Sequence, residues 1–270
     1  MAITLTFPKG AALITGGTGR VGGGAVRRFA EAGVPVIFTY RSRQKVAFDL
    51  ERELKEQGYD VRARQMDAAI TQSIDDVFDD AIQQFGRVHS VVCGSGTEFT
   101  FNKLADYPED YVSRYLNDDA MGYYRIFRSA VPRLRASGGG SVSACTTVAT
   151  HRHLSYDGLS AFSKGAVYQL VQNSAAEEGK HNIRFNSVQI GCVTWETLEE
   201  IRNMLPREIP TDPKTSEERW TVLMRDLLGR NRLGRVVDPL EAGGVCCFLA
   251  SDQGSFLTGQ RLALDSGALL

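Results

Sequence analysis

The sequence contains no long hydrophobic run. Although 43% of its 270 residues are hydrophobic, no segment approaches the roughly 18–20 consecutive apolar residues that a membrane-spanning helix needs. The first residues also lack a basic stretch followed by an apolar one, so a signal peptide is not expected. These absences predict a cytoplasmic globular protein.

An excess of one charge is missing as well. The 31 basic and 32 acidic residues leave a net charge of −1. This balance argues against a broad basic surface for nucleic acid or anionic lipid, so neither is an expected partner.

The cysteines lack any metal-binding spacing. None belongs to a CxxC pair or to a Cys/His cluster, so no metal site is expected. Most fall in or beside apolar segments, which indicates buried, reduced thiols. They are Cys93, Cys145, Cys192, Cys246 and Cys247.

Strand-like apolar runs alternate with helical periodicity along the whole chain. This alternation predicts an α/β fold, a Rossmann-type doubly wound parallel sheet with helices on both faces. The predicted strands are 11–14, 34–40, 62–66, 88–93, 141–144, 184–189 and 262–264. The predicted helices are 20–32, 43–57, 71–85, 107–136, 158–179 and 239–251. No linker or repeat interrupts them, so residues 1–270 are expected to form a single domain.

The segment 192–235 departs from this alternation. It is polar and contains three prolines and both tryptophans, Pro206, Pro210, Pro213, Trp195 and Trp220. Because it follows a strand, it should lie over the carboxyl ends of the sheet, where ligands bind in such folds. We interpret it as a substrate lid, with helical packing or an oligomer contact as the alternative.

A glycine-rich turn follows the first strand and opens the first helix. Glycines let the backbone approach a pyrophosphate, and the helix start presents free N–H groups to it. This strand–turn–helix context predicts a dinucleotide site, with a glycine turn that binds nothing as the alternative. The expected contacts are Gly16, Thr18, Gly19, Arg20, Val21 and Gly22.

The second predicted strand ends near the position that meets the ribose 2′ group of a dinucleotide. An acidic residue there would accept hydrogen bonds from a 2′-hydroxyl group. This chain instead has Arg41, Ser42 and Arg43, with Arg20 nearby in the glycine turn. Guanidinium groups match a phosphate in charge and geometry, so we expect NADP(H) rather than NAD(H). Solvated surface arginines are the alternative.

These features resemble the classical short-chain dehydrogenase/reductase (SDR) family from about Lys9 to Gly267. Further matching segments are Asp67-Ala68, residues 183–188, Gly234-Arg235, Pro239, Glu241, residues 248–252, Thr258-Gly259 and residues 265–267. The resemblance implies that Asp67, Ala68, Gly94, Gly191, Val193 and Lys164 also contact the cofactor. It further implies a homodimer or homotetramer formed through the helices at 107–136 and 158–179.

The family's catalytic Asn, Ser, Tyr and Lys can be carried over position by position. Lys164 falls on the lysine, Thr147 on the serine and Asp119 on the asparagine, with Asn117 on another side of the same helix. The tyrosine position holds Ser160. A serine hydroxyl is a far weaker acid than a phenol, whose pKa is about 10. The usual proton donor is therefore missing.

Nearby side chains offer alternatives for that proton. Tyr156 lies eight residues before Lys164 and could bring its phenol into the vacated space. His151 and His153 follow Thr147, and an imidazole titrates in the range that acid–base catalysis at neutral pH requires. The sequence leaves these alternatives open.

A serine at the tyrosine position, with the lysine kept, resembles the 2,4-dienoyl-CoA reductase branch, which also uses NADPH. Residues 175–180 and 183–186 resemble that branch too. Its members carry a tyrosine just after the Ser/Thr position, where this chain has Ala149. The resemblance implies an oxidoreductase that reduces a carbonyl or a conjugated enone or enoyl compound through a rearranged site. The alternative is a non-redox or catalytically silent relative, such as a lyase, an isomerase or an oligomer partner.

Overall fold

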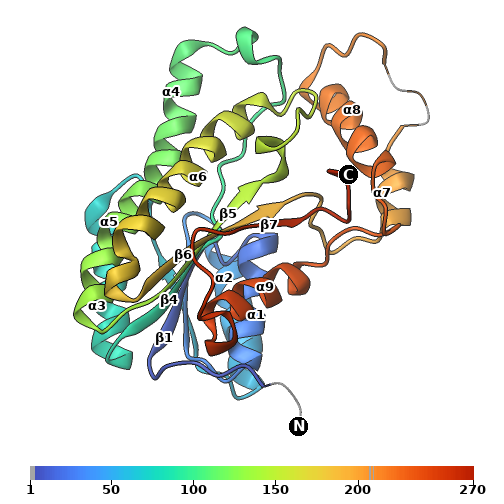
Figure 1. The fold of residues 1–270 in the computed structure, drawn as a ribbon. Helices are drawn as coiled ribbons and strands as arrows, with labels where there is room; N and C mark the ends of the chain where they lie inside the picture. The colour runs from blue at the N-terminus through green and yellow to red at the C-terminus, as the bar shows by residue number, and fades with distance from the viewer. Residues whose placement is uncertain (1–3, 207, 209) are drawn as a thin grey trace.

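Seven parallel strands form one sheet in the computed structural model, which describes residues 4–206, 208 and 210–270 (Figure 1). The strands lie in the order β3-β2-β1-β4-β5-β6-β7. They are β1 (Ala11–Thr15), β2 (Val36–Tyr40), β3 (Val61–Gln65), β4 (Val88–Cys93), β5 (Gly140–Thr147), β6 (Ile183–Ile190) and β7 (Arg261–Leu264). The order reverses direction between β1 and β4, and in such sheets ligands bind beyond the carboxyl ends of the strands at this point.

Helices cover both faces of the sheet. They are α1 (Arg20–Glu31), α2 (Gln44–Glu56), α3 (Thr71–Phe85), α4 (Glu109–Asp118), α5 (Ala120–Ala136), α6 (Gly158–Glu178), α7 (Leu198–Met204), α8 (Ser216–Gly229) and α9 (Pro239–Ala250). Short 3₁₀ turns are η1 (Leu104–Asp106), η2 (Val148–Thr150), η3 (Gly179–His181) and η4 (Asp252–Gly254). Figure 1 shows α1 and α9 on one face and α3, α5 and α6 on the other.

The central strands are buried on both sides. Every residue of β1, β2 and β4 is buried, and their apolar side chains enter two separate core clusters. One cluster packs under α1, α2 and α9, and the other under α3, α5 and α6. Continuous apolar runs are what a parallel sheet between two helix layers requires.

Helices α1 and α9 pack with their backbones in contact. A Cβ atom added to Gly24 would lie 1.9 Å from the Pro239 carbonyl oxygen, and one added to Gly243 would lie 2.3 Å from the Gly24 carbonyl oxygen. No side chain larger than hydrogen fits at these two positions. The contact fixes the helix that carries the glycine turn against the last helix of the chain.

The predicted Rossmann-type α/β fold is confirmed, and the structure corrects one predicted helix. All seven predicted strands are present, and no strand end is shifted by more than three residues. The predicted helix 107–136 is two helices, α4 and α5, which meet at Asp119 with backbone angles φ −96° and ψ −78°. Its carboxylate is held by side chains of α6, which stabilises the bend at this residue.

The segment 192–235 contains the two helices α7 and α8, and its positions 207 and 209 lie outside the described residues. Both helices begin with a capping box, formed by Thr197 with Glu200 and by Thr215 with Glu218. In Figure 1 they lie beyond one end of the sheet, apart from the two layers. Among the described residues, no helix is long and apolar enough to cross a membrane.

Candidate functional site

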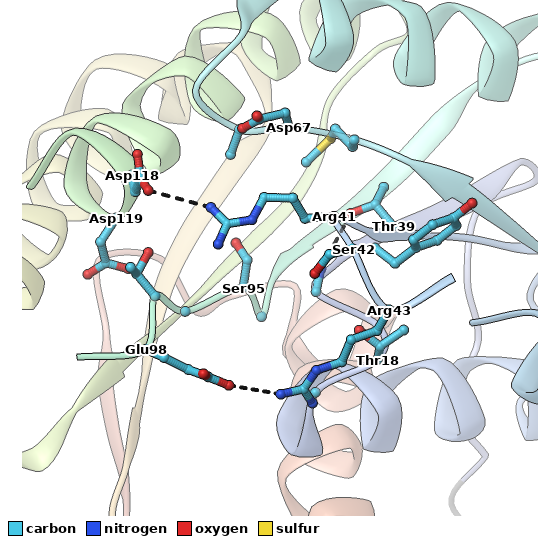
Figure 2. A pocket seen from close by; sticks show the side chains of 18 of the residues that line it. Thr18, Thr39, Arg41, Ser42, Arg43, Asp67, Ser95, Glu98, Asp118 and Asp119 are labelled. Atoms are coloured by element: carbon cyan, nitrogen blue, oxygen red, sulfur yellow. Dashed lines mark hydrogen bonds and ion pairs between the residues drawn. The ribbon is translucent and has the colours of Figure 1, made fainter. Parts of the chain in front are cut away.

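A cleft of about 750 Å³ lies where the strand order reverses. Its walls come from the glycine turn, the end of β2, the turn after β3 and the segment after β4 (Figure 2). Nine of the predicted cofactor residues line it, namely Gly16, Thr18, Gly19, Arg20, Arg41, Ser42, Asp67, Ala68 and Gly94. This volume falls within the range of small-molecule sites in proteins.

The glycine turn brings the start of α1 to the cleft. Gly16 has φ +68°, and a Cβ atom there would lie 2.6 Å from Cα of Ser95, so the turn passes close to the segment after β4. No side chain caps α1, whose N-cap residue is Gly19, and its first turn holds no acidic residue. Uncapped N–H groups and the positive end of the helix dipole favour an anion, so these residues fit a dinucleotide pyrophosphate.

Three arginines reach into or across the cleft from the turn and the end of β2. Arg41 lies 3.5 Å from a carboxylate oxygen of Asp118, and Arg43 lies 2.8 Å from Glu98 (Figure 2). The third arginine, Arg20, pairs with Glu196 at 3.9 Å. Each arginine thus faces an acidic residue that belongs to a different part of the chain. All three arginine side chains are more than half exposed, which leaves them accessible to a ligand.

The turn after β3 forms the far wall. Asp67 accepts a hydrogen bond from the Ala69 N–H at 2.9 Å, and its own N–H donates to Ser73 at 3.0 Å. These bonds hold the Asp67-Ala68 backbone in place beside the cleft. The side chain of Ala68 lies close to Gly122 of α5. A Cβ atom added to Gly122 would lie 3.2 Å from the Ala68 Cβ atom.

Lys164 and Asp119 form a buried ion pair beside the cleft. The Lys164 Nζ atom donates to Asp119 at 2.7 Å, and Ser163 donates to the other carboxylate oxygen at 2.6 Å. The side chains of the pair are 11% and 1% exposed. The Lys164 ammonium also lies 4.1 Å from the centre of the Tyr123 ring, which adds a cation–π contact. The lysine charge is therefore compensated by a carboxylate.

Ser160 and Thr147 lie on neighbouring elements of this region. Thr147 ends β5, and its hydroxyl accepts a hydrogen bond from the Ala149 N–H at 3.2 Å. Ser160 is buried and donates to Asp157 at 3.4 Å. Burial raises the pKa of the Asp157 carboxyl to about 7, although the Ser160 hydrogen bond lowers it in part.

The proton donors predicted from the sequence, His151, His153 and Tyr156, are all more exposed than Ser160. His151 is largely exposed and contacts the Arg261 guanidinium, and partial desolvation of the ring together with that charge lowers its pKa. His153 is exposed. Tyr156 has φ +64°, and its half-buried ring lies 6.0 Å from the guanidinium carbon of Arg219.

Five of the predicted cofactor residues do not line the cleft. They are Val21, Gly22, Gly191, Val193 and Lys164. Of the predicted catalytic residues only Asp119 lines it, while Thr147, Ser160 and Tyr156 do not. Gly22 packs against the turn itself, since a Cβ atom there would lie 2.2 Å from the Gly16 carbonyl oxygen. Val193 forms a bridge with Val237, which joins the start of the 192–235 segment to the residues before α9.

The sequence reasoning missed several acidic residues of this region. Glu98, Asp118 and Glu196 pair with the arginines, and no motif distinguishes them from ordinary surface carboxylates. Asp157 precedes a predicted helix, which is typical of a capping residue, and only its burial sets it apart.

Among the described residues, no group of three or more His, Cys, Asp or Glu side chains is placed to hold a metal ion. The same residues include five free cysteines, of which only Cys192 is partly exposed.

Comparisons with known proteins agree with this geometry. A family model described as enoyl-(acyl carrier protein) reductase matches residues 19–268. A short-chain dehydrogenase/reductase of Pestalotiopsis microspora is 28% identical over 261 residues, which cover 95% of this chain and 94% of that protein. An L-rhamnose 1-dehydrogenase (NAD(P)⁺) of Sphingomonas sp. is 28% identical over 256 residues and 94% of each chain. A solved short-chain type dehydrogenase/reductase from Mycobacterium ulcerans superposes with a TM-score of 0.84 at 24% identity, over 98% of this chain and 91% of that one, and it supports the fold.

Proposed function

Because the chain belongs to the classical short-chain dehydrogenase/reductase family, we propose that it is an NADP(H)-dependent reductase with a rearranged active site. Its substrate is a small molecule that carries a carbonyl group or a conjugated enone or enoyl group. The observation that carries this proposal is the cleft, where an uncapped helix start and three arginines converge. A nicotinamide dinucleotide, when bound, supplies the hydride for such a reduction.

The arginines favour NADP(H) over NAD(H). Arg41 directly follows β2, at the position where an acidic residue would bind a ribose 2′-hydroxyl group. Its guanidinium is 61% exposed and its ion pair with Asp118 is long, at 3.5 Å. An exposed pair of this kind contributes little, about 0–1 kcal/mol. A 2′-phosphate, which carries more charge than a carboxylate, can therefore displace Asp118.

Lys164, Thr147 and Ser160 supply the polar groups for the reacting end of the ligands. The Lys164 ammonium can donate to ribose hydroxyls, and the two hydroxyl side chains can donate to a substrate oxygen. The segment 192–235 covers the site as a lid in this proposal, and residues 1–270 act as one domain. The homodimer or homotetramer and the cytoplasmic location stay predictions.

Cofactor binding tests the proposal directly. The protein's intrinsic fluorescence would be titrated with NADPH and, in parallel, with NADH. We expect tight binding of NADPH and weaker binding of NADH. Arg41→Ala should weaken NADPH binding about 10-fold or more and leave NADH binding nearly unchanged, because a charge-assisted hydrogen bond contributes about 1.5–3 kcal/mol. Arg52→Ala, which removes an exposed α2 arginine paired with Asp49, is the matched control.

Turnover is the second part of the test. NADPH oxidation would be followed with a panel of aldehydes, ketones, quinones and α,β-unsaturated carbonyl compounds. Reduction of at least one compound is expected. A protein that binds neither nucleotide and oxidises NADPH with no member of the panel would contradict the proposed function.

A non-redox or silent member of the family is the second candidate. Ser160 at the tyrosine position and the pairing of Lys164 with Asp119 favour it, because both remove parts of the usual proton relay. A saturating NADPH-dependent reduction that Lys164→Ala abolishes would exclude this candidate.

A further inference from the structure

A buried carboxyl group lies one helical turn before Ser160. Asp157 is the residue that precedes α6, and it is 8% exposed. Its side chain does not cap the helix, and it accepts the Ser160 hydroxyl hydrogen bond instead. Asp157, Ser160 and Lys164 are spaced three and four residues apart, so they share one face of α6. That face meets Asp119, which lines the cleft.

Two tyrosines from the preceding elements lie near enough to the Asp157 carboxyl to feel its charge. Burial raises the pKa of Tyr115 on α4 well above its usual value, and the nearby charges of Asp119 and Asp157 raise it further. Burial raises the pKa of Tyr107, which follows η1, to about 12, and Asp157 contributes to that shift as well. Both phenols therefore remain neutral near Asp157 at physiological pH.

The cations of this region are engaged elsewhere. Lys164 is paired with Asp119, and the guanidinium of Arg219 on α8 lies over the Tyr156 ring. Among the described residues, no cation forms an ion pair with Asp157, and its pKa is set by burial and by Ser160. The start of α6 also favours the ionised form. A carboxyl that titrates near pH 7 is able to donate a proton at neutral pH.

We propose that Asp157 and Ser160 form a two-residue proton relay at the position of the missing tyrosine. This inference rests on the proposed function. Ser160 is the catalytic group that touches the substrate oxygen, and Asp157 is a positioning residue that restores its proton. The proton-donor candidates from the sequence, Tyr156, His151 and His153, are then not needed.

The relay balances the reduction of a carbonyl. A nicotinamide cofactor, when bound, would supply the hydride to the substrate carbon, while the substrate oxygen takes the Ser160 hydroxyl proton. When Asp157 is protonated, its carboxyl O–H donates to the Ser160 oxygen and leaves the Ser160 proton free for the substrate. The Ser160 oxygen then regains a proton from the Asp157 carboxyl. The resulting carboxylate, which accepts the Ser160 hydrogen bond, takes a proton from water. Carbonyl compound, hydride and one proton thus give an alcohol, with Ser160 and Asp157 returned to their starting states.

The first test needs neither cofactor nor substrate. Urea unfolding would be measured from pH 5 to pH 9 for the wild type, Asp157→Asn and the exposed control Asp110→Asn. The folded-state pKa of Asp157 is about 7, above the unfolded value of about 3.9. The folded state therefore holds the extra proton between these values, and the wild type loses stability as the pH rises from 5 to 7.

Asp157→Asn should lack this loss. The difference between its urea midpoint and that of the wild type should grow as the pH rises to about 7. Above that pH the difference should stay constant. Asp110→Asn should differ from the wild type by the same amount at every pH. If Asp157→Asn follows the wild type across the range, the carboxyl is ionised as usual and the relay is wrong.

The second test uses the compound of the panel that is reduced fastest. Loss of a general acid lowers rates about 100- to 10,000-fold, so Asp157→Asn and Ser160→Ala should each lose about 100-fold or more. The double variant should lose no more than either single one, because both act in one relay. The wild-type rate should fall above about pH 7, and Asp157→Asn should lack this fall. NADPH affinity, measured by fluorescence, should be unchanged in every variant.

The outcomes separate the relay from the proposed function. A wild type that binds NADPH and reduces a compound, while Asp157→Asn keeps its rate and pH profile, would overturn the relay alone. A wild type that binds no NADPH and reduces no compound would overturn the proposed function and the relay with it.

Discussion

Lys164 and Asp119 place opposite charges in the interior at the point where α4, α5 and α6 meet. Removing two charges from water costs several kcal/mol per ion, which only good geometry and further hydrogen bonds offset. Ser163 supplies such a bond, and the Tyr123 ring covers the ammonium. A balance of charge at this junction is therefore a requirement for stability as well as a feature of the site.

Asp119→Ala should destabilise the protein by about 3–5 kcal/mol, because it leaves a buried ammonium without a partner. The double variant Asp119→Asn with Lys164→Met removes both charges and should lose much less. Urea unfolding at pH 7 measures both. If Asp119→Ala and the double variant were equally stable, the unpaired Lys164 ammonium would carry no cost, and the prediction would be wrong.

Glu98 offers a second prediction at the scale of single residues. Its carboxylate faces Arg43 across the cleft and is 90% exposed, so the pair contributes little to the fold. It should instead compete with a phosphate for the guanidinium. Glu98→Gln should therefore tighten NADPH binding by about two- to fivefold in a fluorescence titration at low salt. The control Glu51→Gln, from an α2 pair with Lys55, should leave the affinity unchanged.

At the scale of elements, the contact between α1 and α9 depends on two glycines. Gly24→Ala or Gly243→Ala would place a methyl group about 2 Å from the backbone of the facing helix. We expect each to cost about 3 kcal/mol or more in unfolding free energy, since the backbones must separate.

Gly244→Ala is the matched control for this contact. It lies in the same helix, and nothing lies within 4 Å of an added Cβ atom. It should stabilise the protein by about 0.5–1 kcal/mol because alanine favours a helix over glycine. Thermal unfolding of the three variants tests this prediction. Similar losses of stability in all three would contradict the close packing of α1 against α9.

The elements that sequence reasoning predicts well are those whose cause is local. Apolar runs identify the strands, and the strand–turn–helix context locates the glycine turn. The bend at Asp119 escapes such reasoning because residues 109–136 keep one helical pattern, and the bend depends on contacts with Lys164 and Ser163. The capping boxes at Thr197 and Thr215 were available in the sequence as T-x-x-E patterns, yet they lie within a segment that its prolines make look irregular.

At the scale of the whole molecule, the site combines residues that only the fold brings together. Arg41 and Asp118 are 77 positions apart in the sequence, and no pattern in either segment indicates the other. The cleft residues of the glycine turn could be predicted because they are contiguous. The role of Asp157 could not be predicted. What sets this residue apart is that its carboxyl is buried with no cation paired to it among the described residues, and burial at a loop position is a property of the packed structure.

The contact of α1 with α9 also joins the beginning of the chain to its end. The helix that starts at Arg20 finds its packing partner only in residues 239–250, after every other helix of the described chain has been made. A chain that emerges from the ribosome amino end first therefore exposes one face of its first helix throughout synthesis. Completion of the glycine turn becomes a late event of folding, so a dinucleotide that binds there as proposed would stabilise finished molecules and give no support to partial ones.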